Sequence, residues 1–255
     1  SEALDQILRL SLPYDDAKLN PNTPIKALTW LPWNATTTWA PSALQIVVKH
    51  VGDSRTQFRM LQLLERLCYT MLVRRTDQAA YAEVLIKFLD EILDAGNVDP
   101  GRKFGPAWLT DDGKRIVREN LLKPFHFAPE RGAILRRVEL ALAGENLAAN
   151  IDDATVEHIM PQRPGRTTPW FKNFSFEARQ AVTNKLGNLI LLNRGTNKLV
   201  ADWSFEKKKQ QLFRYTTHRH FETAKSLREY DDWNPTIIER RTQEMANALL
   251  RAWEF

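Results

Sequence analysis

Residues 155–161 read TVEHIMP and residues 186–192 read LGNLILL, two short runs that stand out from the rest of the chain. Both have the length and the apolar or β-branched composition that favour strands. Pro161 ends the first run, because proline cannot donate an amide hydrogen to a sheet. Residues 193–200 follow the second run as a predicted turn and short helix. The sequence therefore predicts a strand–strand–helix unit in the C-terminal half.

The rest of the chain carries helical patterns. Apolar side chains recur at spacings of three and four residues, the period of a helix with one buried face. Ser54 and Gln57 fit the capping-box spacing at a helix start, while Asn234 and Pro235 suit the cap and first turn of the last helix. The helical pattern begins at Ser42, where Ser42 and Gln45 also fit the capping-box spacing, and a helix follows from Ser54. Further predicted helices cover 77–93, 112–123, 129–143 and 235–253.

These patterns predict a mainly α protein, a helical bundle that carries the strand–strand–helix unit in its C-terminal half. Residues 1–41 are the exception, since they are rich in proline and tryptophan. Prolines at this density break helices, and the tryptophans favour packing against another surface. The chain begins without a methionine, and we interpret it as a piece of a longer protein.

Composition excludes several classes of protein. The 255 residues include a single cysteine, Cys68, which excludes an internal disulfide framework and a zinc site built from several cysteines. The single cysteine favours a reducing, cytoplasmic location. No apolar run approaches the roughly 20 residues of a membrane-spanning helix, so we expect no membrane association. The net charge of +5 favours an anionic partner only weakly.

Three polar residues of the strand–strand–helix unit are candidates for chemistry: His158 on the first strand, Asn188 at the turn into the second, and Asn197 on the helix. Each also has an ordinary structural interpretation, as a hydrogen-bonded histidine, a turn residue beside glycine, or a cap. Their order within one small unit distinguishes them. Glu157 adjoins His158, and adjacent strand residues point to opposite faces of a sheet.

The motifs His-Ile-x-Pro-Gln and Leu-Gly-Asn-Leu-x-Leu-Leu, followed by Asn, resemble the His-Asn-Asn signature of HNH (ββα-metal) nucleases. More narrowly, the chain resembles the C-terminal nuclease domain of GmrSD-like, modification-dependent restriction proteins, a group that includes the Ssp-type proteins responding to phosphorothioate-modified DNA. Residues 134–139, 205–208 and 227–234 are also similar to that domain. The resemblance covers roughly the second half of the chain.

The resemblance implies a role for each signature residue. His158 would be the general base that takes a proton from the attacking water, and Asn188 would hold the loop and the imidazole in orientation. One divalent cation, Mg²⁺ or Mn²⁺, would bind Glu157 and Asn197 together with a phosphate oxygen and waters. Because neighbouring strand residues point to opposite faces, Glu157 is the residue least suited to its implied role, binding a metal ion on the same side as His158.

Basic residues flank the signature. We predict that Lys207 and Lys208, after the unit, and Arg163 and Arg166, after the histidine strand, contact DNA phosphates. Lys208, three residues after Phe205, is the preferred candidate. The alternative interpretation of these lysines is a solvated helix face.

The resemblance implies a metal-dependent DNA endonuclease that nicks or cuts double-stranded DNA in defence against foreign or modified DNA. It also implies an upstream nucleotide-hydrolysing domain or subunit outside this chain. One competing hypothesis is a non-catalytic helical module, binding DNA or protein, with a degenerate HNH-like unit; another is RNA cleavage. The presence of all the signature residues favours the enzyme. We predict a helical N-terminal region over 1–129 and a nuclease domain over 130–255, with its core at about 154–201.

Overall fold

The computed structural model describes residues 27–28, 30–32, 35–94, 110–144, 151, 154–200, 202–214 and 220–255. Most of the proline- and tryptophan-rich segment 1–41 lies outside the described residues. None of the helices in the described ranges is long and apolar enough to cross a membrane. The chain forms two compact units, Ser1–Val117 and Arg118–Phe255. The division predicted at 129/130 from the sequence stays a prediction.

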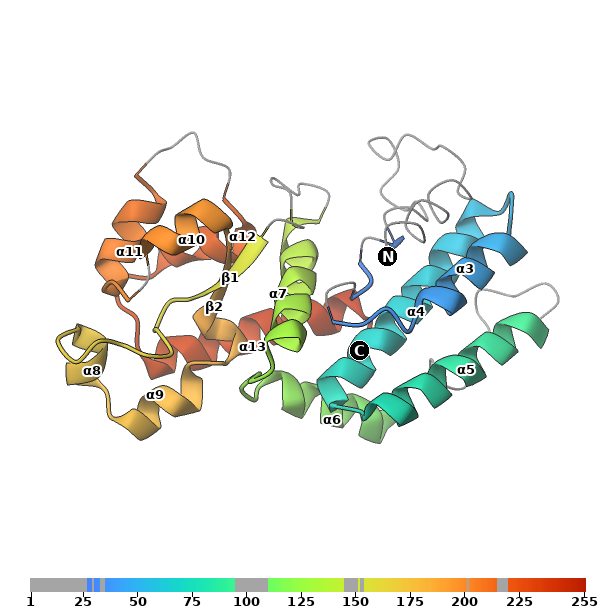
Figure 1. The fold of residues 1–255 in the computed structure, drawn as a ribbon, viewed down its shortest axis with the longest axis horizontal. Helices are drawn as coiled ribbons and strands as arrows, with labels where there is room; N and C mark the ends of the chain where they lie inside the picture. The colour runs from blue at the N-terminus through green and yellow to red at the C-terminus, as the bar shows by residue number, and fades with distance from the viewer. Residues whose placement is uncertain are drawn as a thin grey trace. The chain divides into compact units, whose positions relative to one another are not determined.

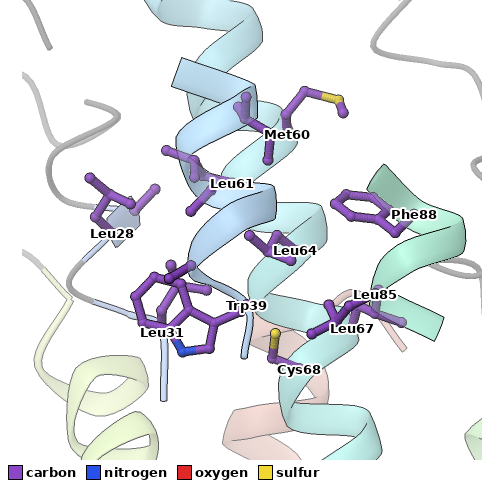
Figure 2. Close-up of a cluster of buried hydrophobic side chains, with 14 of the residues drawn as sticks. Leu28, Leu31, Trp39, Met60, Leu61, Leu64, Leu67, Cys68, Leu85 and Phe88 are labelled. Atoms are coloured by element: carbon purple, nitrogen blue, oxygen red, sulfur yellow. The ribbon is translucent and has the colours of Figure 1, made fainter. Parts of the chain in front are cut away.

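The first unit is built on three helices, α3 (Ala40–Lys49), α4 (Ser54–Arg74) and α5 (Gln78–Asp94), and α3 contacts both of the others. Figure 2 shows their apolar side chains meeting in one core, with Leu64 of α4 near Phe88 of α5. The buried faces follow the predicted helical spacing. A further helix, α6, spans Asp111–Leu121.

The start of α4 differs from the prediction. Asp53 caps the helix, with its carboxylate accepting a hydrogen bond from the Thr56 amide at 3.0 Å, so the predicted capping box at Ser54 is wrong. Aspartate is as good a cap as serine, and here it stands one residue earlier. Gln57 is buried instead and donates to the Val47 carbonyl at 2.9 Å, which joins α4 to α3.

The second unit surrounds a two-stranded antiparallel sheet of β1 and β2, in which His158 lies opposite Leu189. Helix α10 contacts both strands, as the predicted strand–strand–helix unit requires (Figure 1). This arrangement confirms a mainly α fold with a small ββα-like unit. The elements are α7 (Ala128–Ala143), β1 (Ala154–His158), α8 (Pro169–Asn173), α9 (Phe176–Val182), η2 (Leu186–Asn188), β2 (Leu189–Asn193), α10 (Arg194–Val200), α11 (Phe205–Leu212), α12 (Glu222–Lys225), η3 (Ser226–Glu229) and α13 (Pro235–Ala252).

The second predicted strand begins three residues late, because residues 186–188 form the 3₁₀ turn η2 against α13. Gly187 makes this contact possible, since a Cβ at that position would overlap the Ile238 carbonyl oxygen. Its amide donates to Thr242 Oγ1 at 3.0 Å. The LGN part of the motif is therefore a close backbone contact rather than a strand.

Helix α13 packs against η2, α7 and α9. Its predicted cap is confirmed, with Asn234 Oδ1 accepting from the Ile237 amide at 3.1 Å. Arg241 of this helix is buried and donates to the carbonyl oxygens of Gly187 (2.5 Å) and Leu189 (3.0 Å). It also donates to the Thr223 carbonyl at 2.5 Å, so one side chain connects α13, β2 and α12.

Candidate active site

His158 ends β1 with its imidazole half-buried. The Nε2 atom lies 3.1 Å from Oδ1 of Asn184, a residue in the turn between α9 and η2. The sequence alone did not single out Asn184. Its only signal was its position a few residues ahead of the LGN motif, and the contact depends on tertiary folding.

Asn184 is the centre of a polar cluster of five side chains. Its Oδ1 also accepts from Gln162 Nε2 at 2.7 Å and from Arg131 NH1 at 3.4 Å, while its Nδ2 donates to His126 Nδ1 at 3.2 Å. Arginine can only donate, so the contact with Arg131 assigns the oxygen of the Asn184 amide to the side that faces Arg131, Gln162 and His158. The His158 Nε2 must then carry the proton, which leaves the Nδ1 lone pair as the acceptor.

The pKa of His158 falls from 6.5 to about 4. Burial is the largest cause, the positive charge of Arg131 adds to it, and the hydrogen bond to Asn184 opposes it. The imidazole is therefore neutral at neutral pH, the form that accepts a proton. A neutral imidazole whose Nδ1 carries the lone pair is able to accept a proton.

Asn188 is fully buried and makes four side-chain hydrogen bonds. Its Oδ1 accepts from the Met160 amide (2.8 Å) and from Trp233 Nε1 (2.9 Å). Its Nδ2 donates to the carbonyl oxygens of Met160 (2.8 Å) and Thr183 (2.9 Å). Two donors and two acceptors exhaust an amide. Asn188 thus holds the loop after β1, and Asn184 rather than Asn188 contacts the imidazole.

Glu157 points to the other side of β1, as strand alternation requires. Its Oε1 lies 2.5 Å from Lys208 Nζ, and the same ammonium donates to the His158 carbonyl at 2.8 Å. Burial raises the pKa of Glu157 and lowers that of Lys208, and the attraction between the two charges opposes both shifts.

The predicted DNA contact at Lys208 is corrected by this position, because the side chain is 0% exposed. Phe205, Lys208 and Leu212 form the buried face of α11, at the spacing of three and four residues that defines one side of a helix. Its neighbour Lys207 is exposed, with Nζ 4.1 Å from the centre of the Trp203 ring. Arg163 and Arg166 are exposed on the loop after β1.

The predicted metal ligands, Glu157 and Asn197, both contact other protein groups. Asn197 Nδ2 donates to Thr155 Oγ1 at 2.9 Å and to the Val156 carbonyl at 3.1 Å, which attaches α10 to β1. Within the described residues, no group of three or more His, Cys, Asp or Glu side chains is placed to hold a metal ion. With its carboxylate bound to the Lys208 ammonium, Glu157 does not fit a metal ligand in this arrangement.

A comparison with protein-family models matches residues 121–248, half of the chain, to the C-terminal domain of GmrSD restriction endonucleases. The chain belongs to this family. The matched residues of this chain include all five side chains of the Asn184 cluster and both partners of the Glu157–Lys208 pair. A search of the curated proteins found no match.

Membership of the GmrSD family makes the chain a nuclease of a restriction system, and the substrate of such a nuclease is DNA. The arrangement around His158 agrees with that chemistry, because hydrolysis of a phosphodiester needs a group that accepts a proton from water.

Proposed function

We propose that the chain is an HNH-type endonuclease that hydrolyses double-stranded DNA, with His158 as the general base. The observation that carries this proposal is the hydrogen bond from His158 Nε2 to Asn184, which leaves Nδ1 to accept a proton. Water would attack phosphorus as its proton passes to Nδ1, and the bond from phosphorus to the leaving oxygen would break. Asn184 would be a positioning residue that keeps the imidazole in the required tautomer.

A requirement for one Mg²⁺ or Mn²⁺ belongs to the proposal through the resemblance to HNH nucleases. Such a cation would stabilise the charge that develops on the phosphate and the leaving oxygen. The protein itself would supply the proton acceptor, with Asn188 and Lys208 holding the end of β1 and Arg241 holding the start of β2. Arg163, Arg166 and Lys207 would contact DNA phosphates from the surface.

The biological setting is proposed on the same resemblance. The chain would act in defence against foreign or modified DNA, under the control of an upstream nucleotide-hydrolysing domain or subunit. The hydrogen-bonded, neutral imidazole of His158 argues against the competing hypothesis of a non-catalytic module with a degenerate unit, whereas the pairing of Glu157 with Lys208 agrees with it.

Nicking of supercoiled plasmid tests the proposal. We expect conversion to open circles with Mg²⁺ or Mn²⁺, and its loss with EDTA or in His158→Ala. His50→Ala is the matched control, a half-buried histidine of the first unit, and should nick like the parent. Nicking by His158→Ala would disprove the assignment of the base. A folded chain that binds DNA without cutting it under any of these conditions would favour the non-catalytic module.

A further inference from the structure

A pocket of about 500 Å³ lies beside the Asn184 cluster. Asn184, Gln162 and His126 form part of both, so the pocket shares a wall with the group that orients His158. Helices α8 and α9 supply most of the opposite wall. Its size lies in the range of small-molecule and cofactor sites, and a nucleobase fits within it.

Two phenylalanines line this pocket while remaining in contact with water. Phe171 of α8 is 42% exposed and Phe176 of α9 is 59% exposed. Exposed apolar surface gathered in a hollow is a feature of ligand-binding grooves. Aromatic rings in such a position are the surfaces on which unpaired bases stack.

The remaining wall of the pocket is polar and positively charged. Arg163 and Arg179 line it, and none of the described residues in its lining carries a carboxylate, which favours an anionic ligand. Arg179 is held in place: it donates to the Phe174 carbonyl at 2.6 Å, and its guanidinium lies 4.9 Å from the centre of the Phe171 ring. The side-chain amides of Gln162 and Gln180 offer both donors and acceptors.

We infer that this pocket binds one unstacked nucleobase of the DNA substrate, next to the phosphate that is cut. Stacking on Phe171 and Phe176 would offset the cost of removing the base from the duplex, and the amides would contact its edge. Arg163, which is exposed, would contact a flanking phosphate, whereas Arg179 holds the Phe171 wall in place. The inference rests on the proposed function, since it places the unstacked nucleobase beside His158. It adds a feature that would determine which DNA is cut.

The test measures binding separately from cutting. All variants are made in the full chain with His158→Ala, and affinity is measured by anisotropy of a fluorescein-labelled duplex, either fully paired or with one central mismatch. A mismatched base leaves the stack more easily, so the parent should bind the mismatched duplex more tightly. Phe171→Ala and Phe176→Ala should each weaken that binding about fivefold or more and remove the preference for the mismatch.

Phe127→Ala is the matched control, because Phe127 is 62% exposed and lies outside the pocket lining. It should bind both duplexes like the parent. Phe171→Leu keeps an apolar side chain but removes the ring, so loss of affinity in this variant, with an unchanged melting temperature, separates stacking from folding. Arg163→Gln should lower the salt dependence of binding by about one ion, whereas the phenylalanine variants should leave it unchanged.

Two results would overturn the inference. Phenylalanine variants that match Phe127→Ala on both duplexes would show that the rings do not contact DNA. Normal DNA binding with loss of a response to an upstream protein subunit would assign the pocket to protein contact instead. Either result leaves the interpretation of the plasmid assay unchanged. Conversely, nicking by His158→Ala would disprove the role of His158 as general base but would not decide whether the pocket binds a nucleobase.

Discussion

The imidazole of His158 titrates in an unusual range, because burial and Arg131 lower its pKa to about 4. In the unfolded chain the same group takes up a proton near pH 6.5. Between these values the unfolded state binds more protons, so stability increases with pH there and is lost as pH falls from about 6.5 toward 4. The base should also keep its lone pair throughout this range.

NMR titration of ¹³C- or ¹⁵N-labelled histidine checks this expectation. The His158 signals should shift with a midpoint well below 6, and the free energy of unfolding of His158→Gln should depend less on pH between 4 and 6.5 than that of the parent. A His158 midpoint near 6.5 would contradict the buried, neutral imidazole.

The Glu157–Lys208 pair gives a second prediction at the scale of the residue. Lys208→Gln leaves a buried carboxylate without its cation, and we expect it to lower the free energy of unfolding by roughly 3–5 kcal/mol. Lys207→Gln, on the exposed side of the same helix, should change it by less than about 0.5 kcal/mol. Urea unfolding of both variants compares them directly, and equal stabilities would contradict the buried pair.

The same pair allows a test of whether Glu157 binds the metal ion. If Glu157 serves only to hold Lys208, Glu157→Gln should lower stability without moving the midpoint of a Mg²⁺ titration of nicking. A midpoint raised by tenfold or more would restore Glu157 as a ligand.

At the scale of elements, the contact between η2 and α13 depends on the missing side chain of Gly187. Gly187→Ala would force a methyl group against the Ile238 carbonyl, and we expect a loss of about 2 kcal/mol or more. Gly195→Ala is the matched control, because that glycine lies in α10 with open space around it. There alanine should be neutral or stabilise by up to about 1 kcal/mol. Thermal melting of both variants tests the difference, and similar melting temperatures would refute the close contact.

The elements that the sequence predicted well are those whose signals are local. Asn234 caps α13 through its own backbone neighbourhood, and the short, β-prone run that ends at Pro161 suffices to predict β1. Helices α8 and α9 were not predicted, because they have five and seven residues and depend on tertiary contacts. The Arg179 guanidinium, which accounts for the end of α8, bonds carbonyl oxygens that no spacing rule identifies.

The same distinction applies to the candidate site. His158 and Asn188 were identified from the motif, and the buried amide of Asn188 holds the loop as expected. Asn184 was missed and Lys208 was given a surface role, because both depend on which side chains meet across the fold. Charge alone could not separate the buried Lys208 from the exposed Lys207 beside it.

At the scale of the whole second unit, Arg241 joins three elements that are distant in sequence. Arg241→Met would remove the donors of three buried carbonyl oxygens, and we expect a loss of about 3 kcal/mol or more. Arg240→Met, at the exposed neighbouring position of α13, should change stability little. Chemical denaturation followed by circular dichroism compares the two, and a mild effect at Arg241 would mean that water replaces its hydrogen bonds.

The four hydrogen bonds of Asn188 have a consequence for hydrogen exchange. The Met160 amide proton, which Asn188 Oδ1 accepts inside the core, can exchange with solvent only when the loop after His158 separates from the Asn188 side chain. Its exchange rate in deuterium oxide therefore records how often this loop opens in the native protein. That single amide reports how often the loop after β1 moves, and it can be followed without DNA, metal or turnover.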